Sequence, residues 1–274
     1  MIQDLNTHKY HNEFSNRKPI QGDVIFAFSG REVLVNREEE RIFPVYEDFK
    51  DKRITFIYLF AIDEQCYYLA YGKENMSIEG YRFEDINLMR TLKPRHLAFA
   101  AMTAFHLFNW YHTNQFCGCC KGNMIHSEKE RALYCETCGN MVFPRISPAV
   151  IVGITDGNRL LMTKYAGRDY KKYALVAGFC EIGETAEKTV EREVLEEVGL
   201  KVKNIRYYKS QPWGLAGDLL LGFFAEIDGS AEIKLDEAEL SEGVWIERED
   251  IELEEDGVSL TEEMILHFKN HSVV

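Results

Sequence analysis

The stretch GFCEIGETAEKTVEREVLEEVGL, residues 178–200, decides how this sequence is interpreted, because it places many glutamates on one predicted helix. Thr185 is a residue type that caps helix N-termini through its side-chain oxygen, and Gly199 suits the position just past a helix C-terminus. Together they predict a helix from Ala186 to Val198. Glutamates on one helix face repel one another, so this helix needs a compensating positive charge.

Three of the glutamates share one face of the predicted helix. Glu193, Glu196 and Glu197 stand at positions i, i+3 and i+4, which are neighbours on a helix surface. The adjoining face carries the apolar residues expected to pack the helix against a sheet, namely Val190, Val194, Leu195 and Val198. Grouped carboxylate oxygens are the ligands that hard divalent cations such as Mg²⁺ and Mn²⁺ prefer, so we expect a metal ion to neutralise them.

A second interpretation of the same helix needs no metal. Ion pairs four residues apart, Glu184 with Lys188 and Arg192 with Glu196, would stabilise an ordinary exposed helix. In the metal interpretation, Arg192 instead holds one of the carboxylates in place. Residue types alone favour the ordinary helix, and the decision between the two rests on the spacing of the surrounding motif.

Composition bounds the class of protein. The chain has 274 residues with 46% hydrophobic content, enough to bury a sizeable core, and a formal net charge of -13. This charge argues against a generic nucleic-acid binder but not against a metal-bridged phosphate substrate. No apolar run reaches the length of a membrane span, and the start MIQDLNTHKYHNEF lacks a secretory pattern, so we expect a cytoplasmic protein with no membrane partner.

Five of the seven cysteines lie close together and predict a metal site. Cys117 and Cys120 repeat the two-residue spacing of Cys135 and Cys138, by which two turns each offer a pair of thiolates. Cys119 would leave a one-residue spacer and is therefore expected not to be a ligand. Four thiolates complete a closed tetrahedral site, so the expected Zn²⁺ is structural.

The order of predicted elements gives an α+β fold. Hairpins are expected to turn at Ser29-Gly30, near Asp63-Glu64 and at Asp156-Gly157, and strands and helices mix without a regular βαβ rhythm. We expect a mixed sheet in the second half. The predicted domains are a β-rich domain with a linking helix at 1–114, a zinc ribbon at 115–144 and a catalytic domain at 145–274.

The spacing from Gly178 onward resembles the signature of the Nudix hydrolases. Gly178, five residues, Glu184, seven residues and then REVLEEVGL match that signature at every defined position. The resemblance implies an α/β/α sandwich that hydrolyses a nucleoside diphosphate linked to another group. It also implies that Glu193, Glu196 and Glu197 bind the metal, that Arg192 and Glu184 orient the motif, and that Gly178 and Gly199 allow turns at its ends.

Nearly the whole chain is similar to the NADH pyrophosphatase branch of this family. The β-rich start, the cysteine ribbon, FPRISPAVI and then SQPW at Ser210 to Trp213 follow the order of that branch. The resemblance implies a zinc-containing homodimer that uses Mg²⁺ or Mn²⁺ to split NAD(H) into nicotinamide mononucleotide and AMP, and that also removes NAD caps from RNA. GLAGD from Gly214 to Asp218 departs from the branch and leaves the preference for NADH open, since Asp218 adds a negative charge where the family has serine.

The same resemblance implies further site residues. Phe179 and Trp213 correspond to the aromatic residues that stack on the substrate, the tryptophan in a site shared between subunits, and Gln211 is expected to bind substrate with them. Glu239 matches a further acidic residue at the Mg²⁺ or Mn²⁺ site, although Glu237 and Glu242 lie close by.

Other functions remain open from the sequence. The altered loop motivates a Nudix hydrolase of other substrates, such as ADP-ribose or diadenosine polyphosphates. A third possible function is removal of the NAD cap from an RNA, and a fourth is nucleotide binding without hydrolysis. Residues 1–114 contain no clustered chemical motif, so we expect them to act as scaffold or dimer support.

Overall fold

The computed structural model describes residues 1–49, 54–72, 76–167, 172–252 and 257–271. They form two compact units. The amino-terminal unit comprises Ile2–Arg145 with Gly214–Gly217, and the carboxy-terminal unit comprises Met1, Ile146–Trp213 and Asp218–Val274. The domain boundaries predicted at 1–114, 115–144 and 145–274 are not tested by this division and stay predictions.

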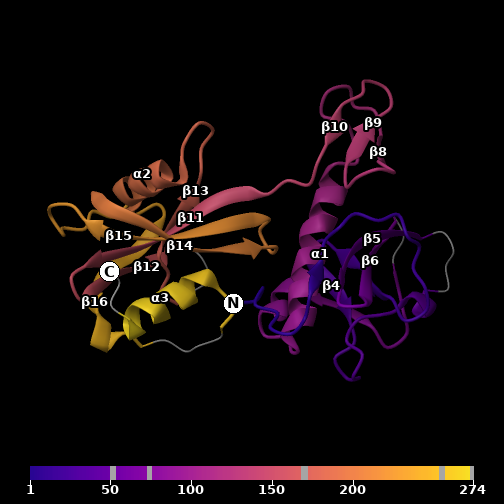
Figure 1. The fold of residues 1–274 in the computed structure, drawn as a ribbon, viewed down its shortest axis with the longest axis horizontal. Coiled ribbons are helices and arrows are strands. Elements are labelled where there is room, and N and C mark those ends of the chain that lie inside the picture. The colour runs from indigo at the N-terminus through magenta and orange to yellow at the C-terminus, as the bar shows by residue number, and fades with distance from the viewer. Residues whose placement is uncertain (50–53, 73–75, 168–171, 253–256, 272–274) are drawn as a thin grey trace. The chain divides into compact units, whose positions relative to one another are not determined.

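The amino-terminal unit consists of short strands and one long helix (Figure 1). A four-stranded sheet has the order β1-β5-β6-β2, from β1 (Tyr10–His11), β2 (Val24–Phe26), β5 (Thr55–Ile62) and β6 (Gln65–Tyr71). A three-stranded sheet has the order β3-β4-β7, from β3 (Phe28–Ser29), β4 (Glu32–Val35) and β7 (Arg82–Asp85). The helices are α1 (Arg95–Thr113) and two short 3₁₀ turns, η1 (Tyr46–Asp48) and η2 (Ile86–Arg90). None of the described helices combines the length and apolarity needed to cross a membrane.

The hairpin predicted at Ser29-Gly30 is confirmed only in part. β3 and β4 form it, but β2 leaves the hairpin and pairs in parallel with β6. Ile25 and Phe26 of β2 are both fully buried, which a two-stranded hairpin cannot provide. The turn predicted near Asp63-Glu64 joins β5 to β6 as expected.

The cysteine-rich segment forms a small antiparallel sheet of its own within the amino-terminal unit. Its order is β10-β9-β8, from β8 (Met124–His126), β9 (Leu133–Cys135) and β10 (Met141–Val142). Strands this short bury little apolar surface, so a bound metal is the natural source of their stability.

The carboxy-terminal unit is built on a mixed sheet, as predicted. The order is β14-β15-β11-β12-β16, with β13 also pairing with β11. β11 and β15 run parallel, and the other strand pairings described within this sheet are antiparallel. The strands are β11 (Ser147–Asp156), β12 (Arg159–Tyr165), β13 (Val176–Phe179), β14 (Val202–Trp213), β15 (Asp218–Ile227) and β16 (Leu240–Glu247), followed by the short turn η3 (Arg248–Asp250).

Two helices cover opposite faces of this sheet (Figure 1). α2 (Ala186–Val198) packs on the core residues Val150, Val152 and Ile154 of β11. α3 (Leu260–Asn270) packs on the other face, which includes Ile151 of the same strand. Because successive side chains of a strand point to opposite faces, β11 supplies both cores, and the predicted α+β class and α/β/α sandwich are confirmed.

Candidate active site

Helix α2 has the ends and the buried face that the sequence predicts. The Thr185 hydroxyl accepts a hydrogen bond from the backbone N–H of Lys188 at 3.3 Å, and Gly199 takes a left-handed conformation with φ 68°. Val190, Val194 and Val198 are fully buried, and each contributes roughly 1.5–3 kcal/mol through burial. The expectation for Leu195 is wrong, because that side chain is 52% exposed.

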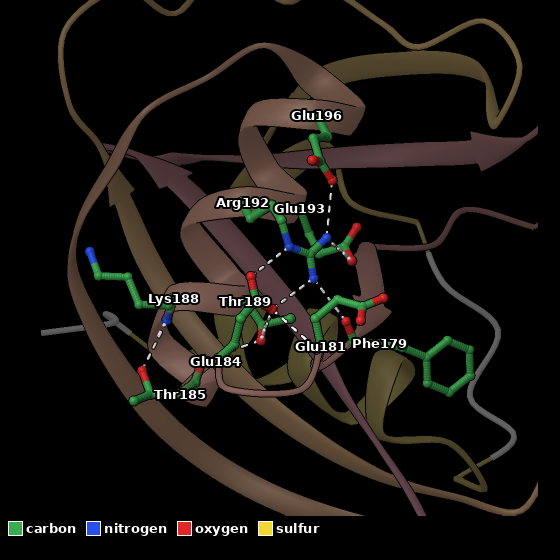
Figure 2. A network of polar contacts seen from close by, with 9 residues as sticks. All are labelled: Phe179, Glu181, Glu184, Thr185, Lys188, Thr189, Arg192, Glu193 and Glu196. Carbon is green, nitrogen blue, oxygen red and sulfur yellow. Dashed lines mark hydrogen bonds and ion pairs between the residues drawn. The ribbon is translucent and has the colours of Figure 1, made fainter.

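An ion pair holds the loop before α2 to the helix (Figure 2). Arg192 donates from Nε to Glu184 Oε1 at 2.8 Å and from Nη2 to Glu184 Oε2 at 2.9 Å. The Thr189 hydroxyl also donates to Glu184, at 3.0 Å. The hydrogen bonds from the Arg192 guanidinium lower the pKa of Glu184 to about 2. Thr189 was not predicted as a site residue, although its place four residues after the N-cap would have suggested it.

The same guanidinium reaches the predicted metal-binding face (Figure 2). Arg192 Nη1 lies 2.7 Å from Glu193 Oε1 and 3.0 Å from Glu196 Oε2, and Nη2 donates to the Phe179 carbonyl at 2.9 Å. One arginine therefore binds three glutamates and fixes the end of β13. Hydrogen bonds to these glutamates, Glu184 above all, raise the pKa of Arg192.

Glu193 is held tightly between α2 and β13. It is 9% exposed, and burial raises its pKa, with the negative charges of Glu196 and Glu239 adding to the effect while Arg192 opposes it. A Cβ placed on Gly178 would lie 1.9 Å from Glu193 Cδ. Gly178 pairs with Val150 inside β13, so it serves this close approach and not the turn expected from the sequence.

The segment that carries Glu239 is tied to the end of α2. The backbone N–H groups of Lys234 and Asp236 donate to the carbonyls of Val198 and Glu197, each at 2.9 Å. The backbone N–H of Glu239 donates to the Asp236 carbonyl at 3.1 Å, so Glu239 follows directly on the residues bound to α2. Glu237 and Glu239 are both exposed.

Glu242, the other nearby alternative, is engaged elsewhere. Lys164 Nζ donates to its Oε2 and the Tyr173 hydroxyl donates to its Oε1, both at 2.7 Å. Both oxygens are therefore occupied by protein donors. These contacts favour Glu239 over Glu242 as the residue that joins the α2 glutamates.

The carboxylate set fits a divalent cation in its chemistry. Its donors are hard oxygens, Glu193 and Glu197 are buried, and burial of Glu193 without enough positive charge raises its pKa. The arrangement is open: among the described residues, only the cysteine group brings three or more ligand atoms within 4.8 Å of one another. Glu196, at 59% side-chain exposure, is held by Arg192 on the solvent side.

The predicted substrate-binding residues differ in their surroundings. Phe179 ends β13 with its ring 54% exposed, as a stacking surface requires. Trp213 ends β14 and pairs with Asp218 across the hairpin. Gln211 is fully buried, with its amide donating to the Val258 carbonyl at 2.8 Å and accepting from the Leu260 N–H at 2.7 Å. Both ends of this amide therefore already bind the chain. Contact of Gln211 with substrate stays a prediction.

The four predicted cysteines come together within the amino-terminal unit. Their sulfur atoms lie within 4.8 Å of one another, with Cys117 and Cys138 at 3.6 Å and Cys120 and Cys135 at 3.4 Å. Backbone N–H groups, that of Cys120 first, lower the pKa of Cys117 to about 6, and backbone N–H groups also lower the pKa of Cys135. The pKa values of Cys120 and Cys138 are raised, because hydrogen bonds with the neighbouring thiols outweigh those from backbone N–H groups. Cys119 lies outside the group, and the cluster fits zinc.

Comparison with known proteins finds a family match over the carboxy-terminal part of the chain. A family model described as NUDIX domain matches residues 145–268. A NAD-capped RNA hydrolase NudC from Photobacterium profundum is 39% identical over 142 residues, which are 52% of this chain and 53% of that protein. The protein of the same name from Erwinia tasmaniensis is 36% identical over 176 residues, 64% of this chain and 67% of that protein.

The match to these relatives is partial in length. It spans about half of the first relative and two thirds of the second. Among solved structures, a NUDIX hydrolase from Nitrosomonas europaea is 25% identical, covers 50% of this chain and 80% of its own, and superposes with a TM-score of 0.45.

Proposed function

This chain belongs to the Nudix hydrolase family, and from that premise we propose that it hydrolyses the pyrophosphate bond of NAD(H) to nicotinamide mononucleotide and AMP. The observation that carries the proposal is the single guanidinium of Arg192 bound to Glu184, Glu193 and Glu196. It joins the carboxylates of α2 to the backbone carbonyl of Phe179, a residue that is 54% exposed.

In the proposed reaction, one water molecule is added across the P–O–P linkage. Its oxygen joins one phosphorus atom, the bridging oxygen leaves with the other, and the water protons are released or retained by the two phosphate products. Mg²⁺ or Mn²⁺, when bound, neutralises the pyrophosphate and lowers the pKa of the attacking water. Glu193, Glu196, Glu197 and Glu239 would hold that cation.

The remaining residues have positioning and binding roles in this proposal. Arg192 and Glu184 keep the loop before α2 attached to the helix, and Gly178 leaves the space that the Glu193 carboxylate occupies. Phe179, with Trp213, would stack on the planar rings of the substrate. The cysteine cluster would hold Zn²⁺ and stabilise the ribbon. The resemblance to the NADH pyrophosphatase branch supports a homodimer, and a cytoplasmic location stays an expectation from the sequence pattern.

A second candidate is removal of the NAD cap from RNA. It is supported by the relatives at 36–40% identity, whose names are NAD-capped RNA hydrolase. The same pyrophosphate bond would be cut, with a polynucleotide as the leaving body. The net charge of -13 opposes strong sequence-independent RNA affinity, so we place free NAD(H) first.

Product analysis with Mn²⁺ tests both candidates. NADH, NAD, ADP-ribose and NAD-capped RNA are compared by kcat/KM, with Glu197→Gln as the inactive control. Release of nicotinamide mononucleotide and AMP from NAD(H) at the highest kcat/KM supports the proposal. Cleavage of ADP-ribose alone would contradict it, and a higher kcat/KM for capped RNA would favour the second candidate.

A further inference from the structure

One carboxylate, that of Glu242, joins three parts of the carboxy-terminal unit. Lys164 on β12 stands directly opposite Glu242 on β16 and binds its Oε2. Tyr173, just before β13, binds the Oε1. The ammonium of Lys164 also lies 4.3 Å from the centre of the Tyr173 ring, so the three side chains contact one another as a set. We call these three residues the Glu242 clamp.

The clamp lies where the ladder between β12 and β16 becomes irregular. Lys164 pairs with Glu242, but the next residue, Tyr165, pairs with Leu240, so Ser241 is an extra residue in β16. The Ser241 hydroxyl donates to the carbonyls of both Lys164 and Tyr165, at 3.2 Å each. Such a β-bulge bends its strand and re-aims the neighbouring side chains, and bulges are frequent next to active sites.

Glu239 lies immediately before β16, two residues from the extra residue Ser241. Its carbonyl accepts a hydrogen bond from the N–H of Ala166 at 2.8 Å. Residues 239–242 are thus attached to residues 164–166 at successive positions. A one-residue slip of this ladder would turn the side chains to the opposite face of the sheet, so its register also bears on the direction in which the adjoining Glu239 faces.

We propose that Glu242, held by Lys164 and Tyr173, is a positioning residue that sets Glu239 at the divalent-cation site of α2. The inference rests on the proposed function for the identity of that site. It gives a positioning role to Lys164 and Tyr173, which both lie outside the Nudix motif. The clamp is partly exposed, at 29% for Lys164 and 36% for Glu242, so as a simple surface ion pair it would contribute little to stability.

Mn²⁺ binding without substrate tests the inference. The full zinc-loaded chain is titrated with Mn²⁺, and the free ion is followed by its electron paramagnetic resonance signal. We expect Glu242→Gln to weaken Mn²⁺ binding about 10-fold, as mutation of a residue that orients a metal ligand does. Lys164→Met should weaken Mn²⁺ binding by a smaller factor. Asp228→Asn, which removes a similar exposed ion pair with Lys203, should leave the affinity unchanged.

A double variant separates positioning from general damage. If Glu242 acts through Glu239, then Glu239→Gln combined with Glu242→Gln binds Mn²⁺ no more weakly than Glu239→Gln alone. Additive losses, or a wild-type affinity in Glu242→Gln, would overturn the inference. Tyr173→Phe keeps the ring and removes only the hydroxyl, so a weaker affinity at an unchanged melting temperature supports positioning even if Glu242→Gln folds poorly.

The inference and the proposed function fail in different ways. A chain whose Mn²⁺ binding is weakened by Glu242→Gln but which leaves NAD(H) intact overturns the proposed function alone. A chain that cleaves NAD(H) while Glu242→Gln binds Mn²⁺ as the wild type does overturns the clamp alone.

Discussion

The cysteine cluster and the glutamate helix both gather metal-binding residues, and they do so in opposite ways. The four sulfur atoms lie within 4.8 Å of one another and are held by two short turns close in sequence. Three of the glutamates are spread around one arginine, Arg192, which also binds the end of β13. A closed set of ligands suits a structural metal, whereas an open set leaves coordination positions for substrate and water.

Glu197→Gln tests the open glutamate site of α2 and should have the largest effect. Loss of one buried ligand charge removes several kcal/mol of transition-state stabilisation, so we expect kcat to fall about 10³-fold. The amide keeps the volume of the carboxylate, and the melting temperature should change little. Steady-state kinetics with NADH and Mn²⁺ measure the loss, and undiminished turnover would contradict the metal assignment.

Cys135→Ser tests the closed set of ligands, which is the cysteine cluster. A structural zinc contributes on the order of 10–16 kcal/mol through four ligands, so losing one is worth about 3 kcal/mol, or roughly 100-fold in zinc affinity. Metal analysis of the purified protein should show zinc lost in this variant and retained in Cys119→Ser. Mn²⁺ binding should persist in both, and its loss with the zinc would show that the two sites are not independent.

Gly178→Ala tests how closely the open site is packed. The added methyl group would overlap the Glu193 carboxyl, and overpacking of this kind costs about 1–3 kcal/mol. Thermal unfolding and Mn²⁺ affinity should both decline. Gly72→Ala is the matched control, because no atom lies within 4 Å of a Cβ at that position, and equal losses in the two variants would refute the close approach.

The pH dependence of stability should show the smallest effect. The pKa of Glu184 is lowered from its ordinary value of 4.5 to about 2 in the folded chain, so its stabilising contribution is present above pH 4.5 and is lost as the pH falls toward 2. Glu193, with a raised pKa, acts with the opposite sign, and its contribution is lost as the pH rises. Melting curves of wild type and Glu184→Gln between pH 5 and 2 should converge at low pH; parallel curves would contradict the ion pair.

Much of the fold and part of the site could be predicted from local patterns. The bounds of α2, its N-cap at Thr185 and the cysteine group follow from the spacing of residues that are close in sequence, and the resemblance to the Nudix hydrolases implied the α/β/α sandwich. Local spacing does not predict features that depend on packing between residues distant in sequence. It did not anticipate the parallel pairing of β2, the exposure of Leu195 or the burial of Gln211.

Local sequence is enough to place three glutamates on one helix face, to pair Arg192 with Glu196 and to group the cysteines by turn, because helix periodicity and turn geometry act over a few residues. Long-range packing is needed to show that a side chain at position 178 would overlap Glu193, and that Glu242 binds Lys164 and Tyr173. These contacts depend on distances between strands and helices that lie apart in the chain, and no local spacing encodes them.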